Sequence, residues 1–176
     1  RVYLRQMYEA GLEAYKDISI GVHPYSWSNA PDERCCDPDG AGWDDRRQFF
    51  MLDTLAAYRA LMREYHHSGR KLWATEFGWA TWDDLNATAP EAWMTHISAE
   101  QQADYILNAF RIAQGLDFMG PMFLWNLNFA NQRTVQASTE YVGYSLLYTA
   151  SETTVVERPV YRALLEKRDA LMGERR

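Results

Sequence analysis

Metal-binding clusters are the first feature that this sequence lacks. Its two cysteines, Cys35 and Cys36, are adjacent, and no CxxC pair or Cys/His group has the spacing of a zinc site. We therefore expect no metal and no other cofactor. Neighbouring cysteines can form a strained disulfide, but two free thiols in a loop are our expectation here.

Clustered basic charge and long apolar runs are also missing. The chain has 24 acidic and 18 basic residues, a net charge of −6, and its basic residues are scattered. Nucleic acids and anionic membranes bind clustered Lys and Arg, so we expect neither as a partner. No run approaches the roughly 20 apolar residues of a membrane-spanning helix, and no signal peptide is visible. The chain starts at Arg1 in helical periodicity, which predicts a start inside a longer polypeptide. The compartment, secreted or cytoplasmic, therefore stays open.

The pattern that is present is an alternation of strands and helices. Apolar residues at helical spacing, a capping box at Ser98 and Gln101, and Pro159 predict four helices. Runs of β-branched and aromatic residues predict three strands, and a long polar loop leads to the last helix. The expected order is helix 3–15, strand 17–25, helix 51–65, strand 71–77, helix 99–115, strand 118–126 and helix 159–171. This alternation implies an α/β fold with parallel strands flanked by helices.

Three strands are too few to close a barrel on their own. A TIM barrel needs eight strands and typically about 250 residues, whereas this chain has 176. A three-stranded parallel sheet would also leave two edges exposed. We therefore expect either a fragment of a barrel or a half-barrel that pairs with another part.

A lone carboxylate ends the second predicted strand. In the stretch 73–79 (Trp-Ala-Thr-Glu-Phe-Gly-Trp), Glu76 follows a short apolar run and is ringed by aromatics. Alternation puts Leu72, Ala74 and Glu76 on one face, where the small residues suit a crowded barrel interior. Taken alone, Glu76 is better explained as a solvated carboxylate at a strand end.

The other two strand tips carry polar or aromatic side chains of matching parity. His23 and Tyr25 share a face at the end of the first strand, and Trp125 lies at the end of the third. Each has a plain structural explanation, as a core histidine, a strand-end tyrosine or a core tryptophan. Three consecutive tips that point the same way nevertheless favour one shared site, because TIM-barrel sites lie at the carboxyl ends of the strands.

These tips also carry a family resemblance. Segments 22–25 (Val-His-Pro-Tyr), 75–78 (Thr-Glu-Phe-Gly) and 123–126 (Phe-Leu-Trp-Asn) resemble strands six, seven and eight of the clan A retaining glycoside hydrolases, and are similar to families 5 and 39. The resemblance implies the C-terminal portion of a (β/α)8 TIM barrel. Residues 1–176 would then form a single partial domain, with the N-terminal strands missing from this chain.

The resemblance also implies catalytic roles. Glu76 matches the nucleophile, Tyr25 matches the residue that hydrogen-bonds the nucleophile, and His23 matches a residue that lines the −1 sugar subsite. A donor such as a tyrosine hydroxyl helps to keep a carboxylate ionised, as a nucleophile must be. The implied activity is hydrolysis of β-linked glycans with retention.

Substrate contacts are expected from aromatic and amide side chains. Trp125 matches the platform under the sugar, since sugar C–H faces pack on indole rings. Asn126 beside it, Trp79 next to the nucleophile, and Trp27 in the preceding loop are further expected contacts. The other loop tryptophans are Trp43, Trp82 and Trp93. The alternative is that half or more of these tryptophans only pack loops onto the barrel.

One catalytic component is missing from the sequence. A retaining hydrolase needs a second carboxylic acid about 5–5.5 Å from the nucleophile, and the family places it in an Asn-Glu pair that this chain lacks. The loop carboxylates are expected in solvated turn or cap roles; they are Asp44, Asp45, Asp83, Asp84 and Glu91.

We therefore expect an enzyme that is inactive as the isolated chain. Its expected partners are an oligo- or polysaccharide and the remaining barrel half. The alternative is a non-catalytic carbohydrate-binding or assembly half-barrel. Three histidines are expected to face solvent, namely His66, His67 and His96.

Overall fold

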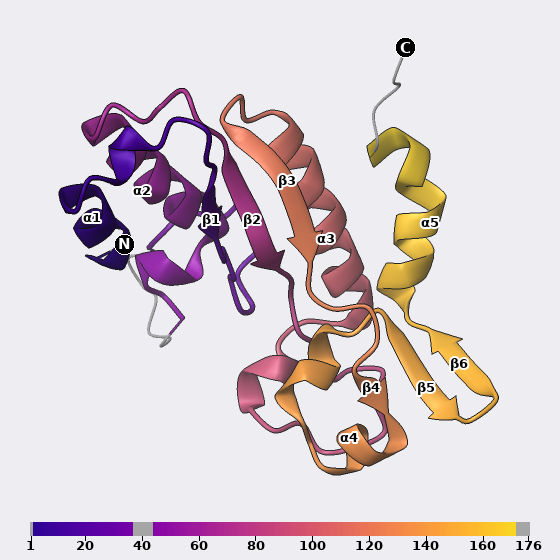
Figure 1. Cartoon of the computed structure of the whole chain (residues 1–176). Helices are drawn as coiled ribbons and strands as arrows, with labels where there is room; N and C mark the ends of the chain where they lie inside the picture. Colours follow the sequence, from indigo (N-terminus) through magenta and orange to yellow (C-terminus); the bar gives the residue numbers. More distant parts are fainter. Residues whose placement is uncertain (1, 37–43, 172–176) are drawn as a thin grey trace.

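The molecule is built on a three-stranded parallel sheet (Figure 1). The computed structural model describes residues 2–36 and 44–171. The strands lie in the order β1-β2-β3, and they are β1 (Ile20–Val22), β2 (Leu72–Phe77) and β3 (Met119–Leu124). Both pairings are parallel, so the expectation of an α/β fold with a parallel sheet is confirmed.

Helices occupy most of the predicted segments. They are α1 (Val2–Glu9), α2 (Met51–Glu64), α3 (Ala99–Gln114), α4 (Gln132–Gln136) and α5 (Pro159–Leu171). The capping box forms as predicted, because Ser98 Oγ accepts from the Gln101 amide and the Gln101 side chain accepts from the Ser98 amide. No helix in the described ranges is both long enough and apolar enough to cross a membrane.

The first predicted helix is wrong in its second half. Helix α1 ends at Glu9, and the chain turns at Gly11 with a φ of 98° before the short 3-10 turn Leu12–Ala14. A left-handed glycine ends a helix at little cost, and this overrides the apolar spacing that continues to Tyr15.

Helices α2 and α3 pack on one face of the sheet (Figure 1). The core beneath them contains Leu72, Ala74 and Phe77 from β2, together with Leu55 from α2 and Ile106 from α3. Leu72 and Ala74 therefore face the helices, and the expectation that they face a barrel interior is wrong. The register between β2 and β3 shifts between Ala74 and Phe77, which breaks the simple alternation.

The other face of the sheet is open. Trp73 is 36% exposed and Phe123 is 51% exposed, and their rings lie 6.3 Å apart. Thr75 is exposed on the same face, where a Cβ at Gly21 would lie 3.3 Å from its side chain. An apolar sheet face of this kind is normally covered by another layer.

A second, small sheet forms where a polar loop is expected between residues 126 and 159. It consists of β4 (Ala130–Asn131), β5 (Leu147–Ser151) and β6 (Thr154–Glu157), and β5 and β6 pair as an antiparallel hairpin. Figure 1 shows this sheet beside the lower end of α5. All of β6 is exposed. Neither of its faces needs apolar residues, so the sequence shows no alternation and does not predict a strand here.

A buried arginine fixes the loops at one end of the molecule. Arg158 is 1% exposed, and it binds both carboxylate oxygens of Asp84, with Nη2 2.6 Å from Oδ1. Its N–H groups also donate to the carbonyls of Thr81, Gly143 and Ser145. Asp84 is exposed in a turn, as expected, and it also forms an ion pair with Arg158 that the sequence does not predict.

A correction concerns His67, which is 2% exposed. Its Nε2 lies 3.3 Å from the Tyr15 carbonyl oxygen, which can only accept, so Nε2 carries the proton. Its Nδ1 then accepts from the Tyr8 hydroxyl at 2.9 Å. The turn after α2 folds His67 against α1, and this contact is not visible in the local sequence. His66 and His96 are exposed, as expected.

Candidate functional site

Glu76 lies at the carboxyl end of β2, beside two side chains that follow β1. The Tyr25 hydroxyl donates to Glu76 Oε2 at 3.1 Å, and His23 Nδ1 lies 3.5 Å from the same oxygen. The Glu76 side chain is 35% exposed. The structure thus brings together the three residues that the sequence predicts as catalytic. Within the described residues, no hydrogen bond is recorded to Oε1, so one carboxylate oxygen is held and the other is free.

The protonation of Tyr25 follows from its surroundings. Burial raises the pKa of Tyr25 well above its ordinary value, and the charge of Glu76 and the hydrogen bond to it raise this pKa further. Tyr25 therefore keeps its proton at neutral pH and remains a donor to the carboxylate. Glu76 is the acceptor in this pair.

Tyr144 supports Tyr25 from the other side, although it is not among the residues that the sequence predicts for the site. The two rings meet edge to face, with centroids 5.5 Å apart. Burial raises the pKa of the Tyr144 hydroxyl, so it too stays neutral. Its neighbour Gly143 is bound by Arg158 and by Gln102, whose side-chain amide donates to the Gly143 carbonyl at 2.9 Å. The tyrosine is thereby fixed through its backbone.

Trp125 follows β3 and lies next to the carboxyl end of β2. Its amide donates to the Phe77 carbonyl at 2.9 Å. A Cβ at Gly78 would lie 2.7 Å from the Trp125 carbonyl oxygen, so only glycine allows this approach. The rings of Phe129 and Tyr141 lie 5.3 Å and 6.4 Å from the Trp125 ring, and both are about half exposed. These two aromatics extend the surface around Trp125 and were missed because they lie in the segment expected to be a polar loop.

Asn126 has a different role from the one predicted. Its side chain is buried and its polar atoms are used inside the protein. Oδ1 accepts from the Ser145 hydroxyl at 2.8 Å and from the Phe129 amide, and Nδ2 donates to the Tyr141 carbonyl. Asn126 therefore positions the aromatics around Trp125, and the predicted sugar contact does not fit its burial.

The predicted contact of Trp79 with substrate is also not available in this arrangement. Trp79 is 1% exposed, and its indole N–H donates to the Asn29 carbonyl at 2.8 Å. Trp79 is part of the hydrophobic core, because the backbone after Glu76 turns its side chain toward the helices. Trp27 is partly buried, with its ring 4.3 Å from that of Phe49. Trp43 lies outside the described residues.

Trp82 and Trp93 are buried in a second hydrophobic cluster together with Tyr144. Trp27 and Trp125 pack against this cluster from outside. Most of the described loop tryptophans therefore hold loops in place, which is the alternative that the sequence left open. Trp125, the expected sugar platform, differs from them because exposed aromatic side chains lie beside it.

The loop carboxylates are engaged away from Glu76. Asp44 accepts from the Ser28 hydroxyl at 2.9 Å, and Asp83 caps α3 by accepting from the Ala99 amide at 3.2 Å. Asp84 is held by Arg158. The turn and cap roles expected for Asp44 and Asp83 agree with these contacts.

One group of possible metal ligands occurs among the described residues. The ligand atoms of Cys35, Cys36 and Asp45 lie within 4.8 Å of one another. The two cysteines are joined in a disulfide, so neither offers a thiolate to a metal. The expectation of two free thiols is therefore wrong.

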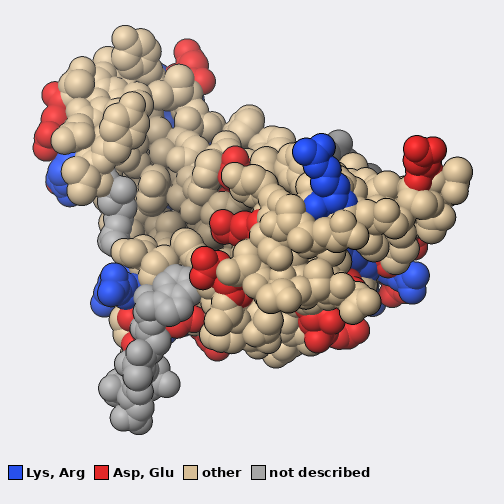
Figure 2. Space-filling model, turned by 90° about the horizontal axis from the view of Figure 1, so that it is seen from below, with Lys and Arg blue, Asp and Glu red and all other residues tan. Residues whose placement is uncertain are grey.

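The face at the carboxyl ends of the strands carries more acidic than basic side chains. Figure 2 looks onto this end from below the view of Figure 1, and red side chains outnumber blue ones around its centre. Such a face repels phosphates and tolerates a neutral ligand.

Comparison with solved structures identifies a similar fold. The chain resembles a family 39 glycoside hydrolase from the gut symbiont Bacteroides cellulosilyticus WH2, with 16% identity, a TM-score of 0.57, and coverage of 91% of this chain and 28% of that chain. The likeness is one of fold, and this chain spans less than a third of that hydrolase. A weaker match is a GH128 endo-β-1,3-glucanase from Amycolatopsis mediterranei in complex with laminaritriose and laminaribiose (21% identity, TM-score 0.35, 62% of this chain and 35% of that chain). No protein-family profile matches the sequence, and no curated protein matches it.

Proposed function

We propose that this chain is the C-terminal portion of a (β/α)8 barrel, with β1, β2 and β3 as strands six to eight. It supplies the nucleophile half of a retaining glycoside hydrolase that acts on β-linked glycans. The observation that carries the proposal is the pairing of Glu76 with Tyr25 at adjacent strand tips, with one oxygen held at 3.1 Å. The fold shared with a family 39 hydrolase supports it.

The free oxygen of Glu76 is the attacking atom in this proposal. Oε1 forms a bond to the anomeric carbon while the bond from that carbon to the glycosidic oxygen breaks. An acid outside this chain donates a proton to the leaving oxygen and then takes a proton from the water that hydrolyses the glycosyl-enzyme. Tyr25 holds Oε2 so that Oε1 keeps a fixed direction.

In this proposal, the aromatic side chains that follow β3 bind the substrate. Trp125 forms the platform for the sugar at the cleavage point, and His23, whose side chain is half exposed beside Glu76, lines the same subsite. Phe129 and Tyr141 extend the platform, which suits an oligo- or polysaccharide better than a single sugar.

The missing parts of the enzyme come from the rest of the barrel. The open face carries Trp73 and Phe123, and both β1 and β3 are edge strands of their sheet. Five further strands and their helices would cover this face and bring the acid to about 5–5.5 Å from Glu76. The isolated chain is therefore expected to be inactive.

The test is to read the coding region upstream of Arg1 and to express the extended protein. We expect hydrolysis of aryl β-glycosides, and we expect Glu76→Gln to remove nearly all of it. Glu91→Gln is the matched control, since Glu91 is an exposed loop carboxylate. Normal turnover by Glu76→Gln would refute the assignment of the nucleophile.

A non-catalytic glycan-binding half-barrel is the second candidate. It is favoured by the engagement of Asp44, Asp83 and Asp84 elsewhere, because these three loop carboxylates are then not free to act as the acid. Glycan binding that persists in Glu76→Ala, with no product from the parent protein, would support this function in place of hydrolysis.

A further inference from the structure

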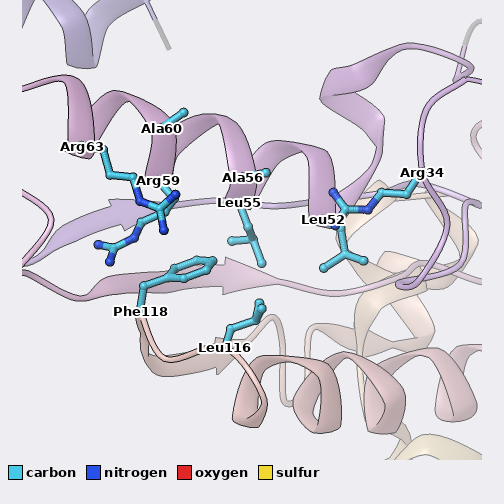
Figure 3. Close-up of a pocket in the computed structure, with 9 residues that line it drawn as sticks. All are labelled: Arg34, Leu52, Leu55, Ala56, Arg59, Ala60, Arg63, Leu116 and Phe118. Atoms are coloured by element: carbon cyan, nitrogen blue, oxygen red, sulfur yellow. The ribbon is translucent and has the colours of Figure 1, made fainter.

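A shallow trough runs along α2 on the helical side of the sheet (Figure 3). Its volume is about 200 Å³. Carbon-rich side chains from α2 and from the segment between α3 and β3 form its floor, and three arginines surround it. The floor consists of Leu52, Leu55, Ala56, Ala60, Leu116 and Phe118, and the arginines are Arg34, Arg59 and Arg63.

Two of these arginines meet at one end of the trough, beside Phe118 (Figure 3). The Arg59 guanidinium lies over the Phe118 ring, 5.2 Å from its centroid, and Nη1 donates to the Ser68 carbonyl at 2.7 Å. Among the described residues, no carboxylate pairs with Arg59 or Arg63. Stacking on the ring and the bond to Ser68 fix the plane of Arg59 while leaving its charge uncompensated.

At the other end of the trough, Arg34 has a carboxylate neighbour, which it shares with Arg47. Asp53 lies 4.0 Å from Arg34 and 3.8 Å from Arg47. The free positive charge is therefore concentrated at Arg59 and Arg63, in a protein whose net charge is −6. A cationic end and an apolar floor together are complementary to a molecule with an anionic head and an apolar body.

We propose that this trough binds a small amphipathic carboxylate. The carboxylate group lies between Arg59 and Arg63, and an unbranched apolar body lies over Leu55 toward Leu52. The trough is smaller than the roughly 300–1,000 Å³ of pockets for drug-sized ligands, which limits the occupant to a short chain. The site is independent of the proposed hydrolase function, because Phe118 precedes β3 whereas Glu76 lies at the opposite end of β2.

The test uses octanoate as the probe and the 176-residue chain as the protein. Calorimetric titration with octanoate is compared with titration with 1-octanol, which has the same apolar body without the charge. Two variants address the site. Arg59→Gln removes the fixed cation, and Ala56→Glu puts a competing carboxylate at an exposed position on the wall of the trough. Arg133→Gln, on α4 and outside the trough, is the control with the same change of charge.

We expect octanoate to bind at least tenfold more tightly than 1-octanol. Both Arg59→Gln and Ala56→Glu weaken octanoate binding at least tenfold, while Arg133→Gln changes it less than twofold. Ala56→Glu keeps a good helix former on an exposed helix surface, so it remains informative if Arg59→Gln unfolds. Equal binding of octanoate and octanol, an equal loss in Arg133→Gln, or no octanoate binding at millimolar concentration would each overturn the proposal.

Discussion

Arg158 and Asp84 are 74 residues apart in the sequence, yet their side chains form a bidentate pair with the guanidinium almost entirely buried. The pair joins the start of α5 to the loop that follows β2. Four backbone carbonyls complete the shell of this guanidinium. The loops around Glu76 therefore depend on one side chain that does not itself touch the site.

Replacing this arginine should strongly destabilise the protein. Arg158→Ala leaves Asp84 and four carbonyls without their partner, and we expect a loss of about 3–5 kcal/mol in the free energy of unfolding. Arg162→Ala is the matched control, because Arg162 is two-thirds exposed and pairs with Glu157 at 3.5 Å. Its expected loss is about 0–1 kcal/mol. Urea denaturation measures both, and similar losses would contradict a special role for Arg158.

The buried His67 should make stability depend on pH. Burial lowers the pKa of His67 in the folded protein, so the unfolded chain binds the proton more readily. The contribution of neutral His67 to the free energy of unfolding is therefore fully present above the pKa of the unfolded chain, about 6.5. It is lost as the pH falls below that value. His67→Asn should remove this part of the pH dependence, whereas His66→Asn, at the exposed neighbour, should retain it. Thermal unfolding at pH 5 and pH 7.5 gives the comparison.

The hydrogen bond from Tyr25 should matter for the chemistry of the complete enzyme. Tyr25→Phe removes a charge-assisted bond to Glu76 while keeping the ring against Tyr144. We expect kcat/KM to fall about 10- to 100-fold on aryl β-glycosides. Tyr15→Phe, on an exposed tyrosine at the other end of β1, should leave it unchanged. An undiminished kcat/KM in Tyr25→Phe would show that this bond does not support the nucleophile.

Substitutions at two glycines test the close contact between Gly78 and the backbone of Trp125. Gly78→Ala would put a Cβ 2.7 Å from the Trp125 carbonyl oxygen, and backbone must move to accept it. We expect a loss of about 1–3 kcal/mol and a change in the near-ultraviolet circular dichroism of the tryptophans. Gly69→Ala, where a Cβ would meet nothing within 4 Å, should be neutral or stabilising by up to about 1 kcal/mol. Equal effects at the two positions would argue against this packing.

The sequence predicts the frame of the fold well where local signals are strong. The capping box at Ser98, the apolar stripe of α2 and the carboxylate at the end of β2 depend on neighbours in the chain, and all three are found in place. The juxtaposition of His23, Tyr25 and Glu76 was also predictable, because parallel strands bring their carboxyl ends together.

The wrong predictions concern features that local sequence patterns do not encode. Glu76 does not share the helix-facing side of Leu72 and Ala74, because the register shifts between Ala74 and Phe77, and no local pattern marks this shift. The burial of His67 and the ion pair of Asp84 depend on partners 59 and 74 residues away. The hairpin of β5 and β6 has an exposed second strand, so its residues read as a polar loop.

The open face of the sheet also gives the protein an optical reporter. Trp73 stands on that face and is 36% exposed, whereas Trp79, Trp82 and Trp93 are buried. Aqueous quenchers such as iodide therefore reach Trp73 in preference to these three indoles. Any polypeptide that covers the sheet will shield this ring and shift its emission to shorter wavelength. Completion of the proposed barrel could thus be followed by fluorescence, without a label and without a substrate.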